Sequence, residues 1–331
     1  MKVIITDHPF PSLDLAKGIF DQHGIEMEAL QTRDPEVIMK HTRKADGIIS
    51  GMARIDQKVI DNLEQCKIAV RLGVGFDTID VSAATTRGIM VVNIPDFCTE
   101  EVSDHAMALI LMIARRVIQG QKAVREGKWG PMAIDFTSFK RMSEQTLGLY
   151  GLGRIARGAA EKAKRFKMNC IAFDPFVTRE GMAMSGVKKV EMKELLARSD
   201  YISLHSPLTK ETENAFGIEE FRAMKRTAWI INTSRGPVIR ESDLISALDQ
   251  NLIAGAALDV LTKEPPDKNH PLVNRDNVIV TPHMASWTWD SRDDLQTKSA
   301  EEVVRALKGE RPKNVVNPEV FSSLKGGKNR S

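Results

Sequence analysis

Short runs of β-branched and other apolar residues alternate with longer segments of helical periodicity along most of the chain. Apolar runs of this length are typical of buried strands in a parallel sheet, and the segments between them predict βαβ units. In the N-terminal part, the predicted strands cover residues 2–6, 45–50, 67–73 and 89–95. Six more strands are predicted after residue 145, at residues 146–151, 170–174, 201–206, 228–234, 253–260 and 277–283.

These two groups of strands predict an α/β protein with two doubly wound parallel-sheet domains. Six strands are the number expected of a complete dinucleotide-binding sheet, so the later group predicts a Rossmann domain. Apolar residues at helical spacing from Val102 to Val117 predict one long helix that opens this domain. A further amphipathic segment at residues 293–308 follows the completed sheet. Because it is free to pack back on the N-terminal sheet, we predict a discontinuous substrate-binding domain, residues 1–98 plus 287–331, and a dinucleotide-binding domain, residues 99–286.

The composition is that of a folded protein whose partners are small molecules. A chain of 331 residues is longer than a single hydrophobic core usually supports, so two domains are expected. Lys plus Arg number 47 against 44 acidic residues, so no basic face for nucleic acid is predicted. No signal peptide and no apolar stretch near the roughly 20 residues of a membrane span is recognisable, which favours a cytoplasmic protein without membrane contact.

Two further features of the composition indicate little about function. The cysteines Cys66, Cys98 and Cys170 are widely spaced and form no CxxC pair, so neither a disulfide framework nor a metal site is predicted. Only residues 325–331 are locally basic, and we expect them to be a disordered end.

A glycine-rich turn follows the first strand of the predicted Rossmann domain. Gly151, Gly153 and Ala156 form a G-x-G-x-x-A pattern that opens a predicted helix from Arg154 to Phe166. The first glycine permits a tight turn, the second lets backbone approach a pyrophosphate, and the small third residue lets helix and strand pack. The phosphate would then bind the N–H groups of Arg154 and Ile155, where the helix dipole favours negative charge.

An acidic residue stands where such a domain binds ribose. Asp174 ends the second strand, 23 positions after Gly151, close to the offset of about 20 residues at which a carboxylate binds the ribose hydroxyls. The structural alternative is an aspartate that caps a turn before Pro175. A carboxylate here would repel a 2′-phosphate, so NAD is the predicted cofactor; Arg179 is the one nearby indication for NADP.

Three polar residues follow late strands of the same sheet, where open α/β sheets place their ligand crevice. Arg235 suits a planar carboxylate, His283 suits proton transfer near neutral pH, and Glu264 suits the orientation of an imidazolium. Each also has a plain structural interpretation, as a surface ion pair, a loop carboxylate before Pro265 or a histidine at a strand end. Together after a nucleotide-binding turn they predict catalysis on a 2-keto or 2-hydroxy acid.

Nearly the whole chain resembles the D-isomer-specific 2-hydroxyacid dehydrogenase family. The matching stretches are RLGVGFDTID, VNIPDFCTEEVSDHA, TLGLYGLGRIA, NTSRGPVI, AALDVLTKEPP and TPHMAS. The resemblance implies that His283 is the general acid/base, Glu264 its partner and Arg235 the binder of substrate carboxylate and carbonyl. It also implies a flavodoxin-like substrate domain and a homodimer formed mainly through the nucleotide-binding domains, with the helix after Cys98 contributing.

The same resemblance implies further contacts. The backbone of Val74 and Gly75 would hold the substrate carboxylate, and Asp259 would meet the nicotinamide carboxamide. Cofactor-lining residues would be Ser206, Pro207, Thr212, Thr233, Ser234, Arg235 and His283. Within the family, the chain looks most like the branch of the C-terminal-binding-protein corepressors and related bacterial dehydrogenases. Arg71 belongs to that likeness, as a second cation near the substrate or as one half of an ion pair.

Three functions remain open at this stage. The first is an NAD-dependent enzyme that interconverts a 2-keto acid and its (R)-2-hydroxy acid. The second is an NAD(H)-sensing binding protein like the corepressors, although Ser286 stands where they have tryptophan and Trp287 comes one residue later. The third keeps the fold and oxidises formate or phosphite, and Glu264 argues against formate. Glycerate, phosphorylated acids and branched-chain acids cannot be ranked from the sequence.

Overall fold

The computed structural model describes residues 1–136 and 139–322 and divides into two compact units. The first unit contains residues 1–98 together with the chain from residue 288 onward, and the second contains residues 99–287. The second break therefore lies one residue after the predicted position at 286/287. The expectation about residues 325–331 concerns positions outside the described residues.

The first unit is built on a five-stranded parallel sheet. Its strands are β1 (Lys2–Ile5), β2 (Glu26–Ala29), β3 (Gly47–Ser50), β4 (Ile68–Arg71) and β5 (Met90–Val92). Their order, β2-β1-β3-β4-β5, is that of the flavodoxin-like fold, which confirms the predicted class. Strand β2 was not predicted because its sequence, EMEA, is not apolar; it forms an edge, where Glu28 pairs with Lys2 at 2.7 Å.

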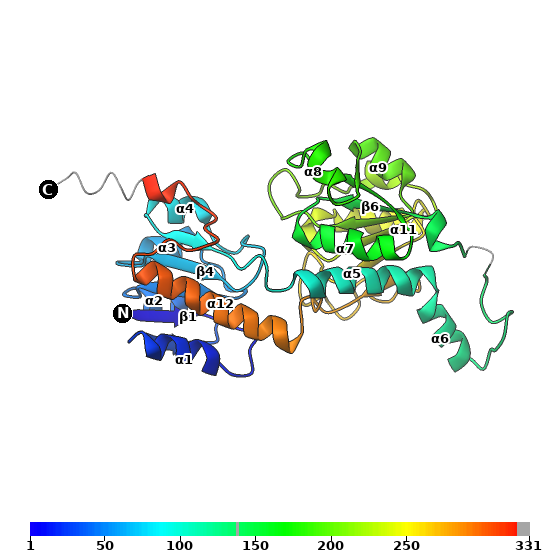
Figure 1. Ribbon diagram of the computed structural model, residues 1–331. Coiled ribbons are helices and arrows are strands. Elements are labelled where there is room, and N and C mark those ends of the chain that lie inside the picture. Colours follow the sequence, from blue (N-terminus) through cyan, green and yellow to red (C-terminus); the bar gives the residue numbers. More distant parts are fainter. Residues whose placement is uncertain (137–138, 323–331) are drawn as a thin grey trace. The chain divides into compact units, whose positions relative to one another are not determined.

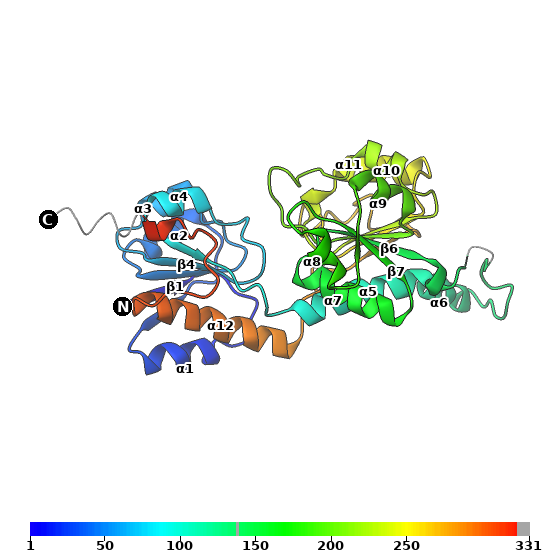
Figure 2. The ribbon, with the colours of Figure 1, turned by 45° about the horizontal axis from the view of Figure 1, so that its top comes forward.

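Helices cover both faces of this sheet. They are α1 (Asp14–Gln22), α2 (Pro35–Thr42), α3 (Gln57–Asn62), α4 (Val81–Thr86) and α12 (Trp289–Leu307). Asp34, Asp56 and Asp80 cap three of them by accepting a hydrogen bond from a backbone N–H of the first turn. Helix α12 begins four residues before the predicted start at 293 and packs against α1 and β4 (Figures 1 and 2).

The second unit is built on a seven-stranded parallel sheet. Its strands are β6 (Thr146–Tyr150), β7 (Asn169–Phe173), β8 (Lys188–Lys189), β9 (Tyr201–Leu204), β10 (Trp229–Asn232), β11 (Gly255–Leu258) and β12 (Val278–Val280). The order β12-β11-β10-β9-β6-β7-β8 is the Rossmann order with one further strand, so the predicted Rossmann domain is confirmed. The prediction of six strands was wrong because it missed the edge strand β8, which consists of two lysines and gives no apolar signal.

The two faces of this sheet pack against different sets of helices. Neighbouring residues of a strand point to opposite faces, and Leu149 and Tyr150 accordingly belong to two separate apolar clusters. The helices of the unit are α5 (Thr99–Ala114), α6 (Val117–Arg125), α7 (Arg154–Arg165), α8 (Arg179–Ala183), α9 (Met192–Arg198), α10 (Ile218–Ala223) and α11 (Glu241–Asp249), with short 3₁₀ turns at Met142–Glu144 and Gly236–Val238.

The single long helix predicted after Cys98 is two helices. Arg116 has a φ of 52°, in the left-handed region, and this ends α5 before α6 begins. Helix α5 packs against α7, where a Cβ added to Gly158 would meet the Ser103 hydroxyl at 2.9 Å. The apolar residues keep their helical spacing across the turn at Arg116, so the sequence pattern did not reveal the break.

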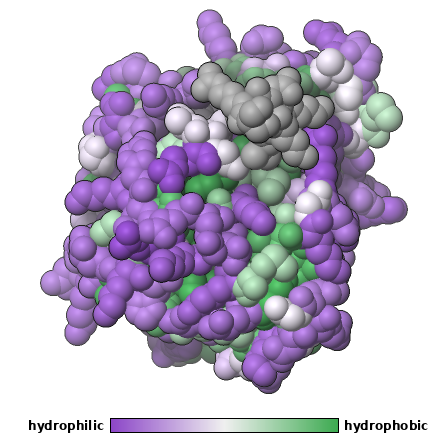
Figure 3. All heavy atoms as spheres, turned by 90° about the vertical axis from the view of Figure 1, so that its left-hand side faces the viewer, coloured by the Kyte–Doolittle hydropathy of each residue, from purple (hydrophilic) through white to green (hydrophobic). Residues whose placement is uncertain are grey.

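On the face shown in Figure 3, hydrophilic residues cover most of the surface and apolar residues show only between them. Among the helices of the described residues, none is long and apolar enough to span a bilayer.

Candidate active site

The predicted site residues of the second unit follow the carboxyl ends of its parallel strands, all at one edge of the sheet. The strand order reverses between β6 and β9, and this switch point is where open α/β sheets bind ligands. Gly151 has a φ of +86°, and a Cβ on it would lie 3.2 Å from the carbonyl carbon of His205 at the end of β9. The turn after β6 therefore requires glycine for both its conformation and its close approach to β9.

Gly153 differs from Gly151 because the fold itself does not demand a glycine there. Its φ of −75° suits any residue, and an added Cβ would meet no protein atom within 4 Å. Gly153 is the N-cap of α7, and the first N–H groups of a helix, here those of Arg154 and Ile155, have no intrahelical partner. Open space beside such donors fits a bound pyrophosphate, while buried Ala156 packs the helix on the sheet.

Asp174 fastens the end of β7 to the glycine-rich turn. One carboxylate oxygen accepts a hydrogen bond from Leu152 N at 2.8 Å, and the other accepts from Phe176 N at 2.8 Å. The turn-capping alternative for this residue is therefore seen in the structure. Ionised carboxylate oxygens can each accept more than one hydrogen bond, so ribose hydroxyls could still bind there.

Two hydroxyls predicted to line the cofactor cleft fit the presence of a polar ligand. Ser206 Oγ and Thr233 Oγ1 are buried and have no hydrogen-bond partner among the described residues. Buried hydroxyls are normally paired, so each offers a contact to a cofactor. The neighbouring predicted residues are held by the chain: Thr212 Oγ1 donates to Pro207 O at 2.6 Å, and Ser234 Oγ donates to Asn232 Oδ1 at 2.8 Å.

The structure brings Glu264 and His283 into direct contact. Glu264 Oε2 lies 2.6 Å from His283 Nδ1, and Glu264 Oε1 accepts a hydrogen bond from Leu261 N at 2.9 Å. With Nδ1 occupied by the carboxylate, Nε2 is the ring nitrogen left to face a substrate. Both side chains are partly exposed, at 34% for His283 and 28% for Glu264, so a ligand can reach them.

Charges around Glu264 keep it ionised. Burial raises the pKa of Glu264, but the hydrogen bond and charge of His283, the Leu261 N–H and the nearby Arg235 guanidinium outweigh burial. The net pKa is therefore lowered, and the residue is a carboxylate at neutral pH. Arg235 is near enough to act on Glu264 electrostatically, and its Nη1 donates to Ser234 O at 2.9 Å.

The backbone of His283 is held in an uncommon conformation. Its φ of 53° lies in the left-handed region, and such outliers persist where surrounding contacts determine them. Those contacts come from Asp259, a buried residue whose Oδ1 accepts from Met284 N and whose Oδ2 accepts from Ala285 N, both at 2.9 Å. Thr281 Oγ1 also donates to Asp259, at 2.5 Å. Asp259 thus holds the loop that carries His283, and its contact with nicotinamide stays a prediction.

Several residues that hold this site were not predicted. Asn232 is fully buried and clamps the Arg235 loop, accepting from Ser234 N and donating to Arg235 O at 2.8 Å. His105 of α5 lies 3.1 Å from Thr281 Oγ1. A buried asparagine inside the INTSRG motif was a usable signal for the first, whereas nothing local in the sequence linked His105 to a strand 176 residues away.

His205 has a lowered pKa. Burial lowers its pKa to about 4, so the ring is neutral at physiological pH, and a ring nitrogen lies 2.9 Å from Ser203 Oγ. His283, in contrast, has the carboxylate of Glu264 at 2.6 Å from its Nδ1.

The predicted substrate residues of the first unit lie at the carboxyl end of β4. Arg71 is buried and donates to Leu72 O at 2.6 Å and to Met52 Sδ at 3.5 Å. Val74 O accepts from Asn93 Nδ2 at 2.6 Å, and Gly75 is partly exposed. Substrate contacts of Arg71, Val74 and Gly75 stay predictions. Trp287 of the second unit is half exposed.

The strand order, the glycine-rich turn and the paired acid and base define a nucleotide-binding domain of the dehydrogenase type. The sequence profile described as "D-isomer specific 2-hydroxyacid dehydrogenase, NAD binding domain" matches residues 107–285. The chain belongs to this family, and NAD is the cofactor of the domain that it contains.

Individual proteins show the same likeness. A glyoxylate reductase of Korarchaeum cryptofilum is 39% identical over 291 residues, which are 86% of each chain. A D-3-phosphoglycerate dehydrogenase of Archaeoglobus fulgidus is 37% identical over 96% of this chain, but the chain spans only 59% of that relative's length. The structure of a D-lactate dehydrogenase from Aquifex aeolicus, complexed with NAD and lactic acid, superposes with a TM-score of 0.86 at 27% identity, with 98% of each chain covered.

Replacing Gly153 with alanine separates cofactor binding from folding. Because the added Cβ meets no protein atom within 4 Å, Gly153→Ala should leave the melting temperature within a few degrees of the wild-type value. The methyl group would enter the space beside the helix N-terminus, so NADH affinity measured by fluorescence titration should fall about tenfold or more. Gly18→Ala, where a Cβ also meets nothing within 4 Å, is the control. Unchanged NADH affinity in Gly153→Ala would contradict the site.

Proposed function

We propose that the protein is an NAD-dependent oxidoreductase that interconverts a small 2-keto acid and its (R)-2-hydroxy acid. The observation that carries the proposal is the 2.6 Å contact between Glu264 and His283, with Arg235 close by, at the sheet edge where the nucleotide turn lies. The names of the relatives, glyoxylate reductase and D-3-phosphoglycerate dehydrogenase, support this class of substrate.

The residues divide the chemistry of reduction between them. The turn at Gly151 and Gly153 and the first N–H groups of α7 would hold NADH, which would supply the hydride for the keto carbon. Protonated His283 gives the Nε2 proton to the carbonyl oxygen as negative charge develops there, so the product is a neutral hydroxyl and a neutral imidazole. Glu264 holds the ring through Nδ1 and stabilises the protonated form before transfer. Arg235 binds the substrate carboxylate with parallel N–H groups and orients the keto group.

The choice between the two nicotinamide cofactors rests on Asp174. Its carboxylate stands after β7, already bound to Leu152 N and Phe176 N. A ribose 2′-phosphate there would meet like charge, so we propose that NADH is preferred to NADPH. Backbone of Val74 and Gly75, with Arg71, is proposed to contribute to substrate binding from the first unit.

A substrate screen tests the proposed reaction. NADH oxidation would be followed with glyoxylate, hydroxypyruvate, pyruvate, phenylpyruvate and phosphorylated or dicarboxylic 2-keto acids, each repeated with NADPH. We expect turnover with at least one acid, and a loss of roughly 10²–10⁴ in kcat for His283→Ala, the usual contribution of a positioned acid. His205→Gln is the control, since that ring is neutral and should leave the pH profile in place. No turnover combined with NADH-dependent capture of a protein partner would favour a sensor instead.

The pH dependence of reduction should move when Glu264 loses its charge. Reduction needs protonated His283, so its rate falls as pH rises. Glu264→Gln keeps the shape of the side chain but removes the charge that stabilises the imidazolium, and the fall should therefore occur at lower pH. The measurement is kcat/KM against pH for both proteins. A midpoint that does not move, or that moves to higher pH, would show that Glu264 is not the electrostatic partner of His283.

We also propose that two copies of the chain associate through α6 and the segment that follows it. Helix α6 packs against α5 and extends away from the seven-stranded sheet (Figure 1). Along it and just beyond, large apolar side chains are exposed, namely Val117, Val124, Trp129, Met132 and Phe136. An apolar surface of this kind favours a protein partner, and the family resemblance supports a second copy.

A double variant tests the dimer. Trp129 and Met132 are 85% and 91% exposed, so serine at both positions should leave the fold intact while removing apolar contact area. Light scattering after size exclusion should give the mass of two chains for wild-type protein and a shift toward one chain for the variant. Met184→Ser, at another strongly exposed methionine, should stay dimeric. A monomeric wild-type protein would refute the proposal.

A further inference from the structure

The loop between β11 and Glu264 is fixed by two carboxylates that bind successive backbone N–H groups. Leu261 N donates to Glu264 Oε1 at 2.9 Å, which is the bond that orients the carboxylate facing His283. The next N–H, that of Thr262, donates to Glu241 Oε2 at 3.1 Å. The two N–H groups belong to adjacent peptide planes that meet at the Leu261 Cα, so Glu241 constrains the plane next to the one from which Glu264 takes its orientation.

Glu241 is itself held by a histidine. Its Oε1 lies 2.9 Å from His270 Nε2, and the side chains are only 22% and 13% exposed. Leu272 N donates to His270 Nδ1 at 3.3 Å, so Nδ1 is an acceptor and the ring proton sits on Nε2, facing Glu241. The pair therefore has one hydrogen-bond arrangement that satisfies every partner, and this fixes the direction of the Glu241 carboxylate.

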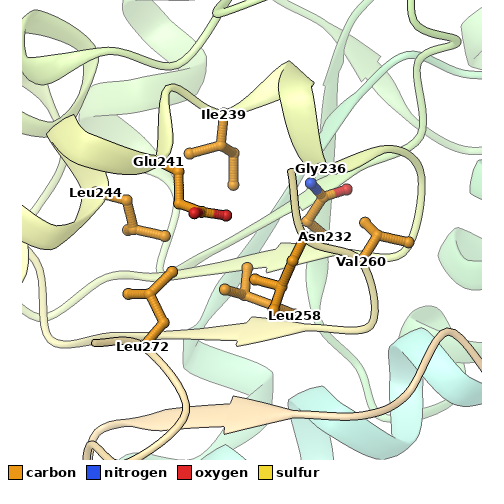
Figure 4. Close-up of a pocket in the computed structure, with 9 residues that line it drawn as sticks. Asn232, Gly236, Ile239, Glu241, Leu244, Leu258, Val260 and Leu272 are labelled. Atoms are coloured by element: carbon orange, nitrogen blue, oxygen red, sulfur yellow. The ribbon is translucent and has the colours of Figure 1, made fainter. Parts of the chain in front are cut away.

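Packing and hydrogen bonds both hold the loop, since the Leu261 side chain is buried in an apolar cluster. A small pocket lies beneath it, lined by Asn232, Gly236, Ile239, Glu241, Leu244, Leu258, Val260, Leu261 and Leu272, and the Glu241 carboxylate points into it (Figure 4). Gly236, one of the lining residues, touches the Leu261–Thr262 peptide, since an added Cβ would lie 2.1 Å from Leu261 C. The peptide thus contacts the residue after Arg235 and also donates to Glu241.

We infer that Glu241, held by His270, is a positioning residue for the catalytic loop. It fixes the Leu261–Thr262 peptide, which adjoins the Val260–Leu261 peptide whose N–H orients Glu264 toward His283, and it keeps the Leu261–Thr262 peptide against Gly236 beside Arg235. The effect of this role on catalysis rests on the proposed function. Glu241 touches none of the reacting atoms; it acts through Glu264.

The chain offers a matched control on the same helix turn. Asp243 also belongs to the first turn of α11, is 21% exposed, and accepts a hydrogen bond from Ile218 N at 3.0 Å. It pairs with Arg240 as Glu241 pairs with His270, but it supports α10 and not the catalytic loop. Glu241→Ala and Asp243→Ala therefore remove the same kind of contact with similar burial.

The test is an NMR titration of the His283 ring, assigned by the loss of its signal in His283→Ala. In Glu241→Ala the titration midpoint should move to lower pH, in the direction of Glu264→Gln but by less, because a loosened carboxylate stabilises the imidazolium less. Asp243→Ala should titrate like the wild type. In turnover, Glu241→Ala should lower kcat about tenfold or more, since misplacement by about 1 Å can cost 10²-fold, with NADH affinity unchanged.

Two further comparisons make the result decisive. In a Glu264→Gln background, adding Glu241→Ala should lower kcat and the His283 titration midpoint little further, because both substitutions act through the same contact. If Glu241→Ala folds poorly, His270→Asn replaces it: the amide oxygen can accept from Leu272 N as Nδ1 does, while the donor to Glu241 is lost, and a smaller shift of the same sign is expected. Wild-type titration in these variants would overturn the inference. Because the titration needs no turnover, an enzyme inactive on every acid would count against the proposed function alone.

Discussion

The 2.6 Å hydrogen bond between Glu264 and His283 is the contact on which the rest of the site depends. Each of its ends is fixed by a different part of the second unit. On the histidine side, Asp259 accepts hydrogen bonds from Met284 N and Ala285 N and holds His283 in a left-handed backbone conformation. On the glutamate side, Leu261 N holds one carboxylate oxygen and leaves the other for the ring. The bond therefore joins two loops that the sheet places at neighbouring strand ends.

The charges around the Glu264–His283 contact keep Glu264 ionised beside the ring. A partly exposed histidine beside a carboxylate has one ring nitrogen oriented by that carboxylate and can still reach a ligand with the other. Arg235 contributes twice, because its charge lowers the pKa of Glu264 and it can bind the substrate carboxylate. His205 shows the opposite case, since desolvation lowers its pKa to about 4. Two histidines of the same domain therefore stand in different electrostatic surroundings.

Much of the fold follows from local pattern. Both parallel sheets were recognisable because buried strands are continuous apolar runs, and the glycine turn was recognisable because it joins such a strand to a helix. Edge strands β2 and β8 were missed since residues such as Glu26 and Lys188 face solvent. The break at Arg116 was missed because apolar spacing continues across it.

The candidate site shows the same division. Arg235, Glu264 and His283 were expected from residue type and strand-end position, and the structure places Glu264 and His283 in contact. Glu241 and Asp259 could not be given their structural roles, since each binds backbone N–H groups of a loop about 20 residues or more further along the chain. A backbone N–H is offered by almost every residue type, so the sequence does not reveal which residue donates to these carboxylates. Asp174 shows the converse, an expected ligand residue that also caps a turn.

The most direct test of the central claim is a crystal structure with NADH and a 2-keto acid analogue bound. The account predicts His283 Nε2 within hydrogen-bond reach, about 2.6–3.2 Å, of the oxygen that becomes the hydroxyl, with Arg235 on the carboxylate and Glu264 still on Nδ1. An analogue whose reacting oxygen is bound by another proton donor, with His283 turned away, would contradict it.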